Sequence, residues 1–148
     1  MKQIKQFLAW ILLLLARFFN YRGKLETVVV LCYKGLDYAM PRSRTGCELL
    51  LKSSFAAYRS GRHSVFSCDA KRGLAIARQE GYANLEATAL GMFGIYHQQK
   101  GDPSEAIQAY QAAVDIFRAL RDRDGEAKVR IPMGTLHSEL GDFDRANA

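Results

Sequence analysis

The sequence predicts an all-α fold, a right-handed superhelical solenoid of about 3.5 stacked antiparallel helix hairpins in a single domain, residues 1–148. The first observation behind this prediction is a set of regularly spaced glycines, Gly23, Gly61, Gly101 and Gly141. The second is that small residues recur at fixed distances from these glycines. The third is a 3–4 spacing of apolar residues between them, which is typical of amphipathic helices.

The residues around each glycine indicate a repeating hairpin with the glycine in its turn. Residues seven positions before and twelve positions after each glycine are small, and leucine recurs eleven positions before with one exception. The residues seven positions before are Ala16, Ser54, Gly94 and Gly134, and those twelve positions after are Gly35, Gly73 and Ala113. The residues eleven positions before are Leu12, Leu50, Leu90 and, as the exception, Arg130. Because such hairpins cannot bury their apolar faces alone, four stacked units are expected, at about 7–40, 47–80, 84–121 and 124–148.

The first unit begins with "KQFLAWILLLLARFF", an apolar run with two interpretations. The repeat register makes it the first helix of the solenoid. Alternatively, residues 7–19 form an uncleaved membrane anchor or interfacial helix, because the run is apolar on nearly every face. Arg17 leaves it shorter than the roughly 20 apolar residues of a spanning helix, and no small-x-small cleavage site follows.

The third unit contains the clearest hairpin signals, in "GIYHQQKGDPSEAIQAYQAAV", residues 94–114. Asp102 is positioned to cap the second helix, Pro103 suits its first turn, and Glu105 completes the spacing of a capping box. The apolar positions that follow are spaced by one, three or four residues and are Ala106, Ile107, Tyr110, Ala113, Val114 and Phe117. This pattern predicts an amphipathic second helix.

The fourth unit contains two irregularities. Pro132 falls within its first helix, which predicts either a kink or a helix that starts near this residue. The sequence stops shortly after the turn expected at Gly141, so Met133, Leu136 and Leu140 are expected to be uncovered. We therefore expect a C-terminal continuation in a longer repeat array, a dimer, or docking through this end.

The stretch "ATALGMFGIYHQQKGDPSEAIQAYQAAVDIFRALRDRDGEA" resembles a tetratricopeptide repeat. The matching residues are Leu90, Gly94, Gly101, Asp102, Ala106, Tyr110 and Ala113. Its "ALRDRDGEA" junction resembles the longer, roughly 40-residue variant of Pins/LGN-like scaffolds and bacterial Rap-type regulators. The resemblance implies a non-enzymatic protein–protein interaction scaffold. The alternatives are a peptide-sensing regulatory module of a longer regulator and a membrane-tethered assembly factor anchored by residues 7–19.

The resemblance also implies a concave groove lined by the first helices of the units. This face would be apolar and amide-rich, with one cation, and would suit an extended peptide or a partner helix. Its expected residues are Leu51, Phe55, Tyr58 and Arg59 in unit two, Ile95, Gln98 and Gln99 in unit three, and Ile131, Thr135 and Ser138 in unit four. The Lys/Asn pattern with which chaperone-binding members clamp a C-terminal carboxylate is absent from these helices, so binding to the tails of large chaperones is not expected. The expected partner is another protein or peptide.

Charge and cysteine content narrow the remaining classes. Residues 1–80 hold 14 basic and 5 acidic side chains, but no run exceeds two basic residues, so a solvated helical surface is expected rather than nucleic-acid binding. The three cysteines, Cys32, Cys47 and Cys68, are odd in number and form no CxxC pair. We expect them to be reduced and buried, which favours a cytoplasmic location; membrane association through the N-terminal segment is the alternative.

Motifs for catalysis or metal binding are not found in the sequence. His97 and His137 occupy equivalent repeat positions, but stacked helices lie about 10 Å apart, too far for shared metal ligands. The Gly-Lys pair of "YRGKLET" lacks P-loop spacing, and no G-x-S-x-G elbow occurs. "RDRDGEA" lacks the loop of a calcium site. No catalytic residue, metal or cofactor is expected.

Overall fold

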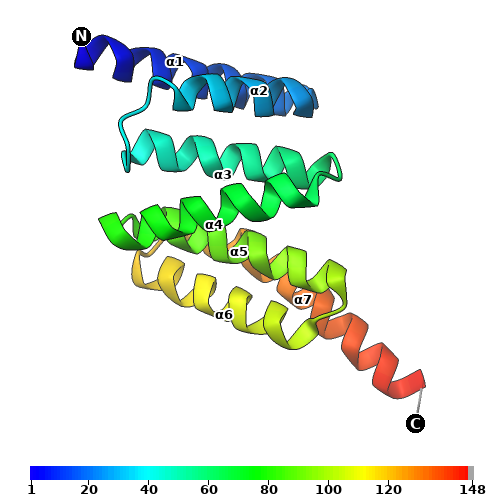
Figure 1. Ribbon diagram of the computed structural model, residues 1–148. Helices are drawn as coiled ribbons and strands as arrows, with labels where there is room; N and C mark the ends of the chain where they lie inside the picture. The colour runs from blue at the N-terminus through cyan, green and yellow to red at the C-terminus, as the bar shows by residue number, and fades with distance from the viewer. Residues whose placement is uncertain (147–148) are drawn as a thin grey trace. The chain divides into compact units, whose positions relative to one another are not determined.

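The computed structural model describes residues 1–146, with side chains described for residues 1–141, and this part of the chain is entirely helical (Figure 1). Its elements are α1 Lys2–Tyr21, α2 Leu25–Leu36, α3 Arg44–Arg59, α4 His63–Glu80, α5 Ala83–Lys100, α6 Pro103–Ala119 and α7 Arg123–Ala146. Residues 147 and 148, the end of the expected fourth unit, lie outside the described residues. The predicted all-α fold of repeated helix hairpins is confirmed.

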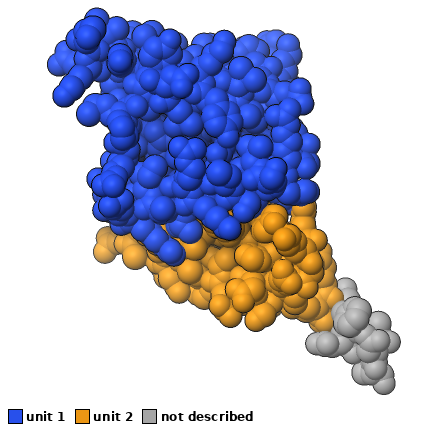
Figure 2. Space-filling view, viewed as in Figure 1, with its two compact units in different colours: residues 1–85 blue, residues 86–148 orange. Residues whose placement is uncertain are grey.

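The helices form two compact units, which we call unit 1 (residues 1–85) and unit 2 (residues 86–148) and which differ from the four predicted repeat units (Figure 2). The boundary between them lies inside α5. Within unit 1, α1 packs against α2, α2 against α3, and α3 against α4, while α1 also contacts α3. Within unit 2, α6 packs against α7. Tyr110 is the largest fully buried side chain of unit 2, where it belongs to a core cluster with residues of α5, α6 and α7.

The turns within the hairpins contain the glycines that the repeat register predicts. Gly23, Gly61 and Gly101 have φ angles of 72°, 76° and 79°, a left-handed conformation that glycine adopts without steric cost. In each turn the N–H after the glycine donates to a carbonyl five residues earlier: Lys24 to Phe19, Arg62 to Ala57 and Asp102 to His97, at 2.8–3.1 Å. These hydrogen bonds close the C-terminus of each first helix.

The turns between hairpins form a second series that the sequence analysis missed. Arg42, Gly81 and Arg121 have φ angles of 61°, 72° and 56° and follow one another at nearly the same interval. Only one of them is a glycine, so the series cannot be found by searching for glycine. Two helices that follow these turns are capped: Ser43 Oγ accepts from the Gly46 N–H at 3.1 Å, and Asp122 Oδ1 accepts from the Gly125 N–H at 2.9 Å.

The small residues of the register lie where helices approach most closely. A β-carbon at Gly94 would collide with the Tyr110 ring, and one at Gly73 would lie 2.8 Å from Leu51 Cδ2. A β-carbon at Gly35 would lie 2.9 Å from Leu49 Cδ1. The predicted close approach is therefore confirmed at these positions. It is wrong for Gly134, which is exposed and has no atom within 4 Å of a β-carbon placed there.

Large and small side chains alternate between equivalent positions of two hairpins. Phe66 in α4 is followed one helical turn later by Ala70, whereas Ala106 in α6 is followed by Tyr110. All four residues are fully or almost fully buried. Each hairpin therefore places one ring and one methyl group on the buried face of its second helix, in opposite order.

The last helix differs most from the prediction. α7 continues without a break through Pro132 and Gly141 to Ala146, so neither a start near Pro132 nor a turn at Gly141 is present. A glycine inside a helix costs only about 1 kcal/mol, so a single glycine does not by itself end a helix. The prediction that the apolar face of α7 is uncovered is also wrong, because Leu136 is buried and Met133 and Leu140 pack against the core cluster of unit 2.

Two local predictions also fail. Asp102 stands at the N-cap of α6, with Pro103 in the first turn as predicted, but its side chain accepts no capping hydrogen bond. The Asp102 carboxylate instead lies 3.8 Å from His97 Nδ1. Cys32 and Cys47 are buried as expected, whereas Cys68 is exposed because it lies on the outer side of α4.

The N-terminal apolar run forms α1, which pairs with α2 as the first hairpin. Its buried residues are Ala9, Leu13 and Ala16, while most of its larger apolar side chains are exposed. Within the described residues, α1 is also the one helix whose length and composition would allow it to cross a membrane.

Candidate functional site

The predicted site residues of unit 2 occupy α5 and α7. On α7, Ile131, Thr135 and Ser138 are all exposed, and Ile131 exposes 71% of its surface. The Thr135 and Ser138 hydroxyls donate to carbonyls one turn earlier in the same helix, at 3.2 and 3.1 Å. These three residues therefore form a mixed apolar and hydroxyl stripe, which we call the α7 stripe.

Gln98 connects α5 to both other helices of unit 2. Its Oε1 accepts a hydrogen bond from the Tyr110 hydroxyl of α6 at 2.9 Å, and its Nε2 donates to Glu139 Oε2 of α7 at 3.1 Å. Both polar ends of the amide are thus used inside the unit. The next residue, Gln99, is exposed, and Ile95 is partly buried against the core cluster. The bridge from Gln98 to Glu139 places this part of α5 beside the C-terminal end of the α7 stripe.

The predicted site residues of unit 1 lie on α3 and differ in their surroundings. Leu51 is buried against Gly73 and serves the contact between α3 and α4. Phe55 is half-buried, and the Arg59 guanidinium stands 5.9 Å from the centre of its ring, within cation–π range. Phe55 and Arg59 therefore stay at the surface of unit 1, whereas Leu51 does not.

The hydroxyl of Tyr58 is a buried polar atom without a hydrogen-bond partner among the described residues. The Tyr58 ring packs against the Phe66 ring, with centroids 5.5 Å apart. Burial raises the pKa of Tyr58, so the phenol stays protonated at neutral pH and remains a potential donor. A buried polar group normally finds a partner, which makes this hydroxyl a candidate contact for a bound molecule.

A fully buried carboxylate in unit 1 was missed by the sequence analysis. Asp69 of α4 accepts hydrogen bonds from Ser53 Oγ of α3 at 2.7 Å and from the Tyr33 hydroxyl of α2 at 3.1 and 3.0 Å. Burial and the Asp69 carboxylate raise the pKa of Tyr33, which keeps its phenol protonated as a donor. The three side chains join three helices, so their role is structural.

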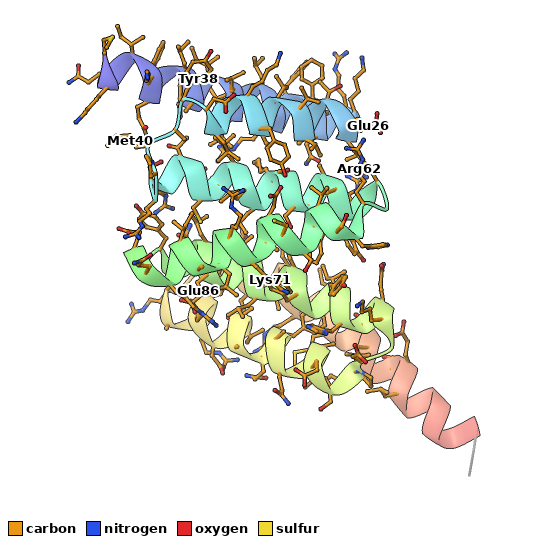
Figure 3. The ribbon with its side chains drawn as sticks, viewed as in Figure 1. Glu26, Tyr38, Met40, Arg62, Lys71 and Glu86 are labelled. Atoms are coloured by element: carbon orange, nitrogen blue, oxygen red, sulfur yellow. The ribbon has the colours of Figure 1, made fainter. Side chains whose placement is uncertain are left out.

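Ion pairs link neighbouring helices at the surface of unit 1. Arg62 Nη2 lies 3.0 Å from Glu26 Oε1, and the two side chains point toward each other at one end of the unit (Figure 3). Glu48 pairs with Arg17 of α1 at 3.1 Å and with Arg44 of its own helix at 3.3 Å. Exposed pairs of this kind contribute at most about 1 kcal/mol each.

Among the described residues, no cluster of three or more His, Cys, Asp or Glu side chains that could hold a metal ion occurs. His97 contacts the Phe93 and Tyr96 rings, whereas His137 is exposed, so the two equivalent histidines have different surroundings. Burial raises the pKa of Cys32 to about 12 and that of Cys47 to about 11, which keeps both thiols protonated and unreactive.

Repeated helix hairpins with a surface of apolar and amide side chains define a helical-repeat protein. Residues 85–148 match the family model described as tetratricopeptide repeat. A search of the curated proteins found no match to the chain. The matched segment supports the tetratricopeptide-repeat family, whose repeats mediate protein–protein interaction and are typically non-enzymatic.

Proposed function

We propose that this chain is a non-enzymatic interaction module that binds a peptide or partner helix along α5 and α7 of unit 2. The observation that carries the proposal is Ile131, a large apolar side chain that exposes 71% of its surface on the α7 stripe. Thr135 and Ser138 extend the stripe, and Gln99 adds an exposed amide on α5. Apolar anchors flanked by amides and hydroxyls suit an extended peptide or an amphipathic helix.

The α3 surface of unit 1 is a separate candidate contact surface. Its contributors are the Phe55 ring with the Arg59 guanidinium, and the Tyr58 hydroxyl, which has no hydrogen-bond partner among the described residues. The nearly 40-residue interval between turn glycines further supports the longer repeat variant for both units.

A peptide-display screen on the full chain, followed by calorimetric titration of the selected peptides, tests the proposal. Ile131→Ala is expected to weaken binding about tenfold, because most of the exposed isoleucine side chain becomes buried when the complex forms. Tyr58→Ala tests the α3 surface in the same way. The matched control is Leu120→Ala, which removes an exposed apolar side chain outside both surfaces. If Ile131→Ala and Leu120→Ala bind equally well, the α7 stripe is not the site.

A further inference from the structure

Helix α1 presents an unusually apolar outer surface. The exposed side chains of this surface, which we call the outer face of α1, are Ile4, Phe7, Trp10, Leu14, Leu15 and Phe18. Phe7, Trp10 and Phe18 expose 58%, 48% and 51% of their surface. A contiguous apolar patch of this kind marks an interaction site on a protein surface.

The outer face lies opposite the side on which α1 packs. The buried residues Ala9, Leu13 and Ala16 are spaced by four and three positions, so they form one stripe of the helix. Phe7 and Phe18 fall on the opposite side of the helix at 3.6 residues per turn, and Trp10 falls on its flank. Folding of unit 1 therefore uses one side of α1 and leaves its aromatic side free.

The charged side chains of α1 and of the turn that follows it are all positive. Residues 1–24 contain five basic side chains and no acidic one, and one of them, Arg17, pairs with Glu48 of α3. Arg22 borders the outer face, because its guanidinium lies 5.0 Å from the centre of the Phe18 ring at the end of α1. Lys2 and Lys5 stand at the start of α1 on the side of the buried stripe. Aromatic side chains bordered by cations match the boundary between the headgroups and acyl chains of an anionic bilayer.

A second copy of the chain fits this face less well. Two outer faces in a symmetric dimer would bring their cationic borders together, and like charges facing each other oppose association. An anionic surface neutralises the same charges, so the charge pattern favours lipid over self-association.

The packing of α1 indicates that it lies along a membrane instead of crossing it. Gln6 Oε1 accepts from the Met40 N–H at 3.3 Å, and Arg17 pairs with Glu48 at 3.1 Å. These contacts and the buried stripe hold α1 against α2 and α3. A spanning α1 would either break them or draw the charged residues of α2, including Glu26, into the hydrocarbon.

We propose that the outer face of α1 binds an anionic membrane surface, with the helix in the plane of the interface. Phe7, Trp10, Leu14 and Phe18 enter the acyl boundary, while Arg22 and Lys24, which lie over the Phe18 and Phe19 rings at the end of α1, contact headgroup phosphates. This site belongs to unit 1 and is independent of the peptide-binding surface proposed above.

Trp10 is the single tryptophan of the chain and provides a direct probe. The full chain is mixed with vesicles of phosphatidylcholine alone or with 30% phosphatidylserine, a proportion of roughly the anionic content of a cytoplasmic leaflet. With anionic vesicles, the Trp10 emission is expected to shift to shorter wavelength, and the protein should co-sediment. Brominated lipids should quench Trp10 most strongly when the bromine lies near the headgroup, since the helix is shallow.

Paired variants separate the contributions of the apolar face and the charges. Phe7→Ser with Phe18→Ser is expected to lower the partition coefficient on the order of tenfold or more. Arg22→Gln with Lys24→Gln is expected to lower it on the order of tenfold on anionic vesicles only. Leu120→Ser, an exposed apolar residue of unit 2, is the control and should bind normally.

Three outcomes would overturn the proposal. The first is the absence of a fluorescence shift and of co-sedimentation with anionic vesicles. The second is a concentration-dependent dimer that buries Trp10 without lipid, which would make the outer face a self-association surface. The third is strongest quenching from the bilayer centre, which would indicate a spanning helix. Circular dichroism of each variant confirms that unit 1 remains folded.

Discussion

The left-handed conformation of Arg121 predicts that a glycine at this position stabilises the protein. A non-glycine residue in this region costs about 1–2 kcal/mol, and Arg121 has a φ of 56° in the turn between α6 and α7. Glycine removes that strain but adds about 0.4–1 kcal/mol of backbone entropy to the unfolded state. Arg121→Gly should therefore raise the free energy of unfolding by about 0.5–1 kcal/mol. Urea denaturation followed by circular dichroism should show a higher midpoint with an unchanged slope.

Two control variants sharpen this experiment. Gly81→Arg makes the reverse exchange in the equivalent turn, where φ is 72°, and should destabilise by a similar amount. Lys128→Gly places a glycine at an exposed position inside α7, where it should cost about 1 kcal/mol. If Arg121→Gly destabilises the protein as much as Lys128→Gly does, the strain argument is refuted.

Three further predictions concern buried and charged groups. Asp69→Ala should destabilise the protein by about 2–4 kcal/mol in urea denaturation, because two hydroxyls lose their acceptor; a loss as small as that of Asp124→Ala, an exposed residue, would contradict this. Hydrogen bonding and ion pairing with arginines lower the pKa of Glu126, so its stabilisation is present above its unfolded-state pKa and is lost as the pH falls through the lowered value. Glu126→Gln should therefore reduce the difference in stability between neutral and acidic pH; an unchanged difference would contradict this. Cys68 should react with a thiol reagent in the native protein, while the two buried cysteines should react only after unfolding; fast reaction of all three would contradict the structure.

The sequence predicted the turns within hairpins better than the turns between them. Gly23, Gly61 and Gly101 are recognisable because a left-handed turn favours one residue type. The equivalent requirement between hairpins is met by Arg42 and Arg121, whose side chains give no local signal. Gly141 shows the converse limit, since α7 continues through a glycine at which the repeat register predicts a turn.

The candidate site could be predicted as a set of positions but not as a set of contacts. The tetratricopeptide resemblance placed Ile131 on the expected binding face, and its exposure agrees with that expectation without testing binding. The hydrogen bonds that join Gln98 to Tyr110 and to Glu139 depend on which helices approach one another. The burial of Asp69 beside Tyr33 depends on the same information. The pairings of Gln98 with Glu139 and of Asp69 with Tyr33 each span more than 30 residues, and no sequence rule comparable to helical spacing predicts such pairings.

The opposite order of ring and methyl group in α4 and α6 has a consequence for how this protein could vary. Placing tyrosine at Ala70 beside the existing Phe66 would overfill the buried space, and placing alanine at Tyr110 beside Ala106 would leave a cavity. Each position can therefore change only together with its partner one turn away. If equivalent segments of α4 and α6 are exchanged, chimaeras whose exchanged segment carries both positions of a pair should fold. Chimaeras with a crossover between the two positions of a pair should not.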